Sequence, residues 1–403
     1  MGVYHMKKIA RFLISICTVV SILLSCSCKV SNKSWERQEN YGPTVDFFLH
    51  PKGGGKFEGW RFVYDREKNK VIPLSKKNII MGASYSSYLD SKYAEQIKAA
   101  EDNNELGQCN DYICFDDIEM LLYWNWGSEN MNTLLTIQNG NINLIDIGRG
   151  THFKFSYYDS DSKTVYLQDY LTWNDESTKC SANIYKVDLK SNSVTKENVC
   201  VYNEEIEQKF NISSQMKYPV SAWEKSSTQK IASLSLIPDG DYFMMCVTFS
   251  PVIDGTYSYM NLLVKYNTVL KQPEAVTVLN ETVCQFQKKD DGYITFSEYI
   301  NQTGVRAYNS VERLWITRYD NNLTAIETTE IKSERFGECN SLLVYSAGND
   351  AFITGENGSA LSNFLAYYNM STGEISYADD MPSGFVMNYR LIQKTDGKIK
   401  NIQ

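Results

Sequence analysis

Short apolar or alternating runs recur along the chain, each followed by Asp, Asn or Gln, a polar turn and a second short run. In one clear copy, Trp60–Asp65 leads through residues 66–69 into Lys70–Ile72. Period-two alternation is typical of β-strands, and a few turn residues between two such runs predict a β-hairpin. The same pattern predicts hairpins at residues 60–72, 134–147, 184–194, 262–278, 314–326 and 364–375.

An Asp or Asn side chain can cap a turn by accepting backbone hydrogen bonds, which accounts for its recurrence at the turn start. The turn-start positions 65, 138, 188, 267, 320 and 369 are separated by 73, 50, 79, 53 and 49 residues. About 50 residues accommodate a four-stranded sheet, and hairpin repeats of that size indicate a β-propeller. We therefore predict an all-β fold in which each hairpin forms the outer half of a blade. Inner strands are expected at apolar runs such as Tyr242–Thr248, Tyr293–Ser297 and Leu342–Tyr345.

The pattern resembles β-propeller repeats in general across residues 57–400 and matches no named subclass. The length of this region predicts about seven blades, and six or eight would also fit. Two β-sandwich domains are the alternative, although they do not require a period near 50. Good helix formers at residues 91–105 predict a short helical insertion, and the polar residues 201–235 also lengthen one repeat.

The N-terminal residues predict an export signal. Basic residues between positions 7 and 11 precede an apolar run from Phe12 to Leu24. As a helix this run reaches about 20 Å, too short for the ~30 Å apolar layer of a bilayer. It ends in Leu23-Leu24-Ser25-Cys26, which resembles the lipobox of bacterial lipoproteins. The resemblance implies cleavage before Cys26, a lipid on its thiol, and a membrane-anchored chain in the bacterial envelope. The alternatives are that Cys28 carries the lipid, or that the signal peptide is cleaved at another position.

These features divide the chain into a signal peptide (1–25), a lipid-anchored flexible tether (26–56) and a propeller (57–403). The tether is polar and ends in three glycines, which are costly to order. Ser27 replaces the Asp that favours inner-membrane retention in some bacteria, so the outer membrane is the expected location.

The chain is 43% apolar and 22% charged, an ordinary balance for a globular protein, and its formal net charge is −8. Loss of the basic signal would make that charge more negative. Because no basic residues cluster, nucleic acid is not expected as a partner.

Ten cysteines in an exported chain allow disulfides. Cys109 and Cys114 bracket an expected four-residue turn, and Cys180 and Cys200 flank a predicted hairpin, so both pairs are candidate disulfides. Free buried thiols are the alternative. No Cys-x-x-Cys occurs and the chain has three histidines, so we expect no metal site and no cofactor.

Candidate chemistry is sparse. His152 is the lone histidine between predicted strands, with no nucleophile motif beside it. Acidic runs occur at 116–119, 159–161 and 290–291, and two close carboxylates would suffice for glycoside cleavage. Solvated turns explain the second and third runs better.

Trp124 and Trp126 are candidate ligand contacts, because exposed aromatic residues stack on sugars or are buried at protein interfaces. Most of the 52 aromatic residues (28 Tyr, 17 Phe and 7 Trp) are expected in the core. The sequence therefore favours a non-catalytic binding or scaffold module for protein or glycan. A glycoside hydrolase or lyase with paired carboxylates near the propeller channel, and a component of an envelope assembly machine, are the alternatives.

Overall fold

The computed structural model describes residues 41–51, 57–79, 97–99, 106, 108–114, 118–124, 131–149, 153–169, 171–174, 178–220, 231–253, 256–257, 259–301, 310–356, 362–379, 384–392, 394–395 and 398–399. By its internal contacts the chain divides into residues 1–41 and a body of residues 42–403. All described elements belong to this body, with β1 beginning at its border.

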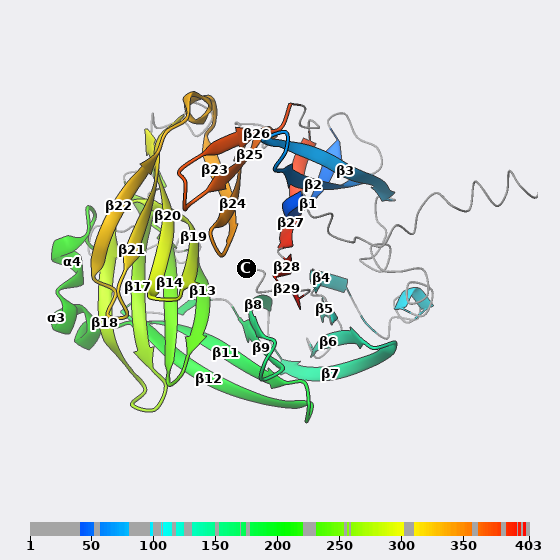
Figure 1. The fold of residues 1–403 in the computed structure, drawn as a ribbon. Coiled ribbons are helices and arrows are strands. Elements are labelled where there is room, and N and C mark those ends of the chain that lie inside the picture. Colours follow the sequence, from blue (N-terminus) through cyan, green and yellow to red (C-terminus); the bar gives the residue numbers. More distant parts are fainter. Residues whose placement is uncertain are drawn as a thin grey trace, which may run out of the picture. The chain divides into compact units, whose positions relative to one another are not determined.

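Six large antiparallel sheets make up the described body (Figure 1). Sheet 1 has the order β27-β1-β2-β3, and sheets 2, 4, 5 and 6 run β4-β5-β6-β7, β13-β14-β17-β18, β19-β20-β21-β22 and β23-β24-β25-β26. Sheet 3 runs β8-β9-β11-β12, with the short β10 also paired to β11. Their bounds are β1 Tyr41–Pro51, β2 Phe57–Asp65, β3 Lys70–Ile79, β4 Gln108–Cys114, β5 Glu119–Trp124, β6 Met131–Gln138, β7 Asn141–Arg149, β8 Lys154–Asp159, β9 Thr164–Gln168, β10 Thr172–Trp173, β11 Cys180–Asp188, β12 Ser193–Tyr202, β13 Ile231–Asp239, β14 Tyr242–Ser250, β17 Met260–Asn267, β18 Gln272–Leu279, β19 Thr282–Lys289, β20 Gly292–Asn301, β21 Ser310–Tyr319, β22 Ala325–Ile331, β23 Ser341–Ala347, β24 Asp350–Glu356, β25 Ser362–Asn369, β26 Ile375–Tyr377 and β27 Gly384–Ile392.

Two small hairpins, three short helices and the helical residues 97–99 complete the described elements. The hairpins pair β15 (Val252–Ile253) with β16 (Thr256–Tyr257) and β28 (Lys394–Thr395) with β29 (Lys398–Ile399). The helices are α3 (Glu204–Phe210), α4 (Ile212–Gln215) and the 3-10 turn η5 (Glu334–Glu338). Of the helices in the described segments, none combines the length and apolar character needed to cross a bilayer.

The outer hairpins of sheets 1, 3, 4, 5 and 6 are built around a side-chain-capped turn. Asp188, for example, accepts hydrogen bonds from the backbone N–H groups of Lys190 (2.8 Å) and Ser191 (3.3 Å). Four residues after the cap, Asn192 adopts a left-handed conformation with φ 56°, which turns the chain back into β12. Equivalent capping residues in other turns are Asp65, Asp159, Asn267, Asp320 and Asn369.

The sheets follow one another in sequence as blades of a β-propeller. Inner strands of successive sheets contact each other, β4 with β8, β8 with β13, β13 with β19, β19 with β23 and β23 with β27. Sheet 1 combines strands from both ends of the body, because β1 pairs with β27 over Thr44–Pro51. The all-β propeller prediction is confirmed, and the six described sheets lie at the lower end of the six to eight blades expected.

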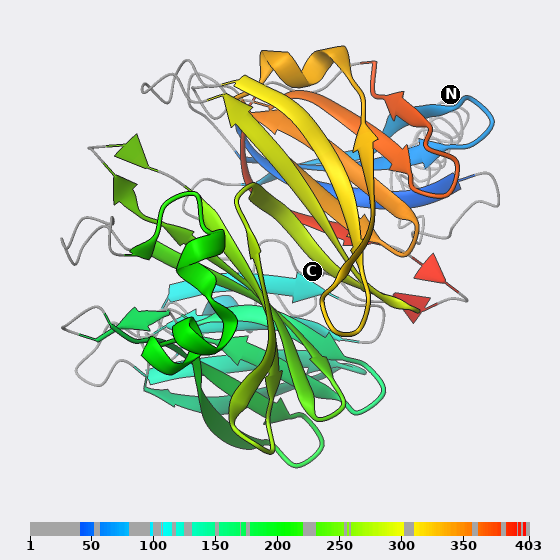
Figure 2. The same cartoon turned by 90° about the vertical axis from the view of Figure 1, so that its left-hand side faces the viewer.

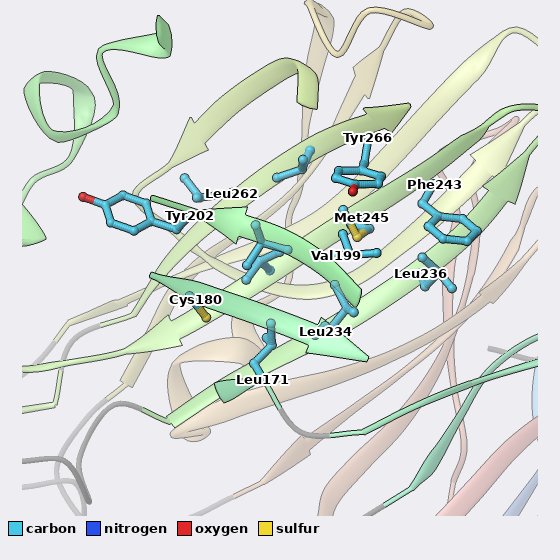
Figure 3. Close-up of a cluster of buried hydrophobic side chains, with 14 of the residues drawn as sticks. Leu171, Cys180, Val199, Tyr202, Leu234, Leu236, Phe243, Met245, Leu262 and Tyr266 are labelled. Atoms are coloured by element: carbon cyan, nitrogen blue, oxygen red, sulfur yellow. The ribbon is translucent and has the colours of Figure 1, made fainter. Parts of the chain in front are cut away.

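Apolar clusters fill the spaces between neighbouring sheets. The largest lies between sheets 3 and 4, where Cys180, Val199 and Tyr202 face Leu234, Met245 and Leu262 (Figure 3). Further clusters join sheets 2 and 3, 4 and 5, 5 and 6, and 6 and 1. Because a central strand buries residues on both faces, its sequence is continuously apolar, as in β14.

The helical pair α3–α4 follows sheet 3 and packs beside β12 and β18 (Figure 2). Asn203 caps α3 by accepting the N–H of Ile206 at 2.8 Å. Glu207 holds the two helices together, since it accepts the N–H of Ser213 (2.8 Å) and the hydroxyl of Tyr202 (3.0 Å). Residues 201–220, part of the polar stretch that lengthens this repeat, therefore contain the end of β12 and two short helices.

Three other predictions from the sequence concern the tether, the turn at Cys109–Cys114 and the helix at 91–105. The tether prediction is wrong for residues 41–51, because they form β1 beside a strand more than 300 residues away. The predicted turn between Cys109 and Cys114 is also wrong, since both lie in the single strand β4. Within the predicted helix at 91–105, the structure describes residues 97–99, which are helical with Ile97 buried.

Candidate binding site

A groove of about 320 Å³ lies between sheets 3 and 4. Strands β11 and β12 form one wall, and the start of β14 and the β17–β18 turn form the other. Its lining consists of Ile184, Lys186, Thr195, Lys196, Glu197, Asn198, Phe243 and Lys271. The volume is at the lower end of the range for small-ligand sites.

Strand register explains which side chains face this groove. Ile184 is opposite Glu197, and Lys186 is opposite Thr195. Since side chains alternate across a strand, these four residues share the face of the β11–β12 hairpin that packs toward sheet 4. Lys196 belongs to the opposite face, and its ammonium lies 5.4 Å from the ring centre of Tyr185.

The apolar part of the groove continues from the core. Phe243 is 7% exposed and meets Tyr166 edge to face, with ring centres 6.1 Å apart (Figure 3 shows Phe243 at one end of the cluster). Tyr166 is paired with Lys186 across β9 and β11. Burial raises the pKa of the Tyr166 hydroxyl, and the nearby Asp159 charge adds to this, so the hydroxyl stays neutral.

Charged groups at the rim are mostly cationic. Lys271 forms an ion pair with Glu197 at 2.6 Å, which bridges sheets 4 and 3. Lys186 is exposed and close enough to Asp159 to affect its pKa. Burial raises the pKa of Asp159, but hydrogen bonds from Ser162 and Asp161 and the charge of Lys186 outweigh that effect, so the carboxyl remains ionised.

The turn that carries Lys271 has an apolar tip. Val269 and Leu270 are 67% and 59% exposed, and both donate backbone N–H groups to the side chain of Asn267 at 2.9 and 2.8 Å. The Asn267 side chain therefore holds the turn through the backbone N–H groups of these two residues, and their aliphatic side chains are left in solvent.

The predicted ligand contacts are not in this groove. Trp124 is 6% exposed and belongs to the buried residues of β5, so its proposed role as an exposed contact is wrong. Trp126 and the lipid-attachment residue Cys26 lie outside the described residues, as does His152.

The cysteines do not form the expected bridges. Cys180 and Cys200 are free thiols, and the register sets Cys200 opposite Ser181 and Cys180 opposite Tyr202. Burial raises the pKa of both thiols. Cys109 and Cys114 are five residues apart along one strand, about 16 Å in extended chain, which is too far for a disulfide.

Several carboxylates in the described segments have structural partners. Asp291 is an exposed turn residue that binds Arg318 at 2.6 Å, and Asp159 caps its own turn. Glu298 is buried and accepts the N–H of Leu342 at 2.7 Å, which joins sheets 5 and 6. Among the residues that the structure describes, no group of three or more His, Cys, Asp or Glu is arranged to hold a metal ion.

Sequence reasoning missed Lys186, Lys271 and the Val269–Leu270 tip. The available signals were a lysine inside the apolar run Ile184–Val187 and two adjacent aliphatic residues at turn positions that, except for Leu323, are polar in the other repeats. Neither signal predicts that β11 and the β17–β18 turn lie on facing sheets.

No protein-family model and no curated protein matches this chain. Similar solved structures include a protein from Lactobacillus plantarum, with 10% identity, a TM-score of 0.38, and coverage of 87% of this chain and 99% of that one. The β-propeller domain of the Trilobed protease from Pyrococcus furiosus has 10% identity and a TM-score of 0.34, covering 84% and 97%. An ulvan lyase, which is a polysaccharide lyase, has 9% identity and a TM-score of 0.41, covering 90% and 94%. At such identities the likeness concerns the fold alone.

Proposed function

We propose that this chain is a non-catalytic binding or scaffold module for protein or glycan in the bacterial envelope. The main support is the composition of the groove between sheets 3 and 4. Its ligand-facing lining contains two lysines, Lys186 and Lys271, a threonine and a single carboxylate, Glu197. A few polar groups placed in this way can fix the orientation of a bound ligand.

The groove does not favour the glycosidase alternative. Hydrolysis of a glycoside commonly needs two carboxyl groups, about 5–10 Å apart, one to donate a proton and one to act as base or nucleophile. Glu197 is committed to Lys271 at 2.6 Å. Asp159 beside Lys186 is held in its turn by Ser162 and Asp161, so it is not free to act on a ligand.

Binding without turnover is the direct test. The full chain, purified in detergent micelles, is run through gels containing neutral or uronic-acid polysaccharides and over immobilised envelope proteins, with the heat-unfolded chain as control. We expect specific retention of the folded chain with a measurable dissociation constant. New reducing ends or unsaturated sugar products would instead establish an enzyme, and equal retention of the unfolded chain would remove the proposal.

The lipid anchor is a separate part of the proposal. The lipobox-like residues 23–26 support attachment at Cys26, and Ser27 in place of Asp supports an outer-membrane location. Palmitate labelling of the full chain expressed in a bacterium is expected to give a labelled band that Cys26→Ala abolishes. Unchanged labelling in that variant, with loss in Cys28→Ala, would move the site to the alternative cysteine.

A further inference from the structure

We infer that the groove and the Val269–Leu270 tip together bind an acidic, partly aliphatic segment of a partner protein. A carboxylate of that segment sits between Lys186 and Lys271, and a neighbouring aliphatic side chain covers Val269 and Leu270. This inference rests on the proposed binding function and names the class of partner.

Charge is the first reason. The chain carries a formal net charge of −8, yet the groove is lined by three lysines against one glutamate. Lys196 is turned to the far face of its hairpin, where it lies over Tyr185. Lys186 and Lys271 therefore remain on the groove side against the single carboxylate Glu197, and this net excess of one positive charge attracts an anionic group.

The apolar turn tip is the second, independent reason. In the other capped turns, the residues two and three positions after the cap are polar, or buried in the case of Leu323. Only their backbone N–H groups are needed for the cap, so Val269 and Leu270 could be polar without loss of the turn. Two adjacent, exposed aliphatic side chains next to Lys271 offer apolar surface that a partner's aliphatic side chain can cover.

The shape and side-chain types favour a peptide over the other anionic partners. A concave groove accepts a protruding side chain, whereas a bilayer presents a flat surface. Sugar rings stack on flat aromatic faces, while Val269 and Leu270 offer branched aliphatic groups and Phe243 is 7% exposed. An Asp or Glu next to Leu or Val in an extended segment matches both halves of the surface.

The ion pair between Lys271 and Glu197 gives a specific signature. Glu197 neutralises Lys271 in the free protein at 2.6 Å, with the two side chains 22% and 60% exposed, respectively. A partner carboxylate must compete with Glu197 for the same ammonium group. Removal of the Glu197 charge is therefore expected to strengthen binding of an acidic segment, an effect opposite to that of ordinary structural damage.

Fluorescence anisotropy of the full chain with a labelled peptide in which Glu alternates with Leu tests the inference. Its Gln counterpart, a soluble polyuronate and anionic lipid vesicles are the comparison ligands. We expect the Glu peptide to bind and the Gln peptide to bind at least about fivefold more weakly, the range of one or two exposed ion pairs. Lys186→Gln should weaken binding about fivefold, Glu197→Gln should strengthen it, and Val269→Ser with Leu270→Ser should weaken it about tenfold or more.

Ile326→Ser is the matched control, because Ile326 is an equally exposed aliphatic residue (58%) on β22, away from the groove. It is expected to leave peptide binding unchanged. Absence of binding to the Glu peptide, equal binding of the Gln peptide, or loss of affinity in Glu197→Gln overturns the inference. Vesicle binding that disappears in the Val269/Leu270 variant would assign the surface to a membrane instead. If the chain binds another glycan or protein and every groove variant behaves like the wild type, the binding function stands and this site is wrong.

Discussion

Asp239 connects sheets 4 and 5 through two side chains of the neighbouring sheet. At the end of β13, Asp239 accepts a hydrogen bond from the buried hydroxyl of Tyr293 and forms an ion pair with Lys288 at 2.6 Å. We predict that Asp239→Ala destabilises the body mainly because the Tyr293 hydroxyl loses its acceptor.

The magnitude follows from the exposure of each partner. Tyr293 is 1% exposed, and a hydrogen bond to a charged acceptor contributes about 1.5–3 kcal/mol net. The side chains of Lys288 and Asp239 are 45% and 34% exposed, so solvent screening limits their ion pair to at most ~1 kcal/mol. The expected loss in the free energy of unfolding is therefore about 2–3 kcal/mol at neutral pH.

Urea unfolding followed by intrinsic fluorescence measures this loss, and a double-mutant cycle identifies its source. Tyr293→Phe should make the further cost of Asp239→Ala smaller by about 1–2 kcal/mol, because no hydroxyl is left unpaired. Asp241→Ala in the same turn is the control. If Asp239→Ala unfolds like Asp241→Ala, or if the two substitutions in the cycle are simply additive, the reasoning is wrong.

The pH dependence of this effect has a defined sign. Burial raises the pKa of Asp239, but the hydrogen bonds from Lys288 and Tyr293 and the charges of Lys288 and Lys265 outweigh it and lower the pKa below its usual value of 3.8. A carboxyl with a lowered folded pKa contributes its stability above the unfolded pKa and loses it as the pH falls through the folded one. The difference between wild type and Asp239→Ala should therefore shrink as the pH falls below 3.8. A difference that stays constant or grows in acid would contradict the assignment.

Three further substitutions test the turns and the sheet packing by thermal unfolding. Asn369→Ala removes the cap of the β25–β26 turn and should cost about 1 kcal/mol, with no loss if the backbone alone fixes that turn. Gly373→Ala should cost about 1 kcal/mol, because Gly373 has a left-handed φ of +74° although its surroundings leave room for a methyl group. Gly337 has the same room without a left-handed φ, so Gly337→Ala should be close to neutral. Equal effects of the two substitutions would contradict the argument from backbone strain. Gly355→Ala should lower stability by about 1–3 kcal/mol, because the added methyl group overlaps the sulfur of Cys339, and a wild-type melting temperature would contradict that packing.

Local chemistry made the hairpins predictable. Each cap residue acts on backbone groups two to four positions later, so Asp65, Asp188 and Asn369 reveal their turns without any knowledge of the partner strand. Asn139-Gly140 does the same through two positive φ values, 50° and 82°. Their near-regular spacing was then enough to indicate a propeller.

Long-range pairing was not predictable in the same way. The segment 41–51 was interpreted as part of a tether from the polar and glycine-rich composition around it, whereas its pairing partner, β27, lies at the other end of the body. Cys109 and Cys114 were assigned to a turn because Asn110 and Asp111 are common turn residues, but β4 incorporates them at a bulge beside β5. In both cases pairing with another strand determines the structure, and a single sequence does not show which strands pair.

The candidate site combines a predictable part with an unpredictable one. The same alternation that buries Ile184 places Lys186 two residues later on the same face of β11, at the edge of the cluster that ends at Tyr166 and Phe243. The β17–β18 turn then brings Lys271 within 2.6 Å of Glu197 on the facing sheet. A lysine at a core-facing position is tolerated there because the apolar contact between sheets 3 and 4 ends at the groove, and the groove leaves its ammonium group exposed to solvent. Position 186 is therefore unfavourable for packing a charged side chain into the core, but it is well placed for an ion pair with a partner protein.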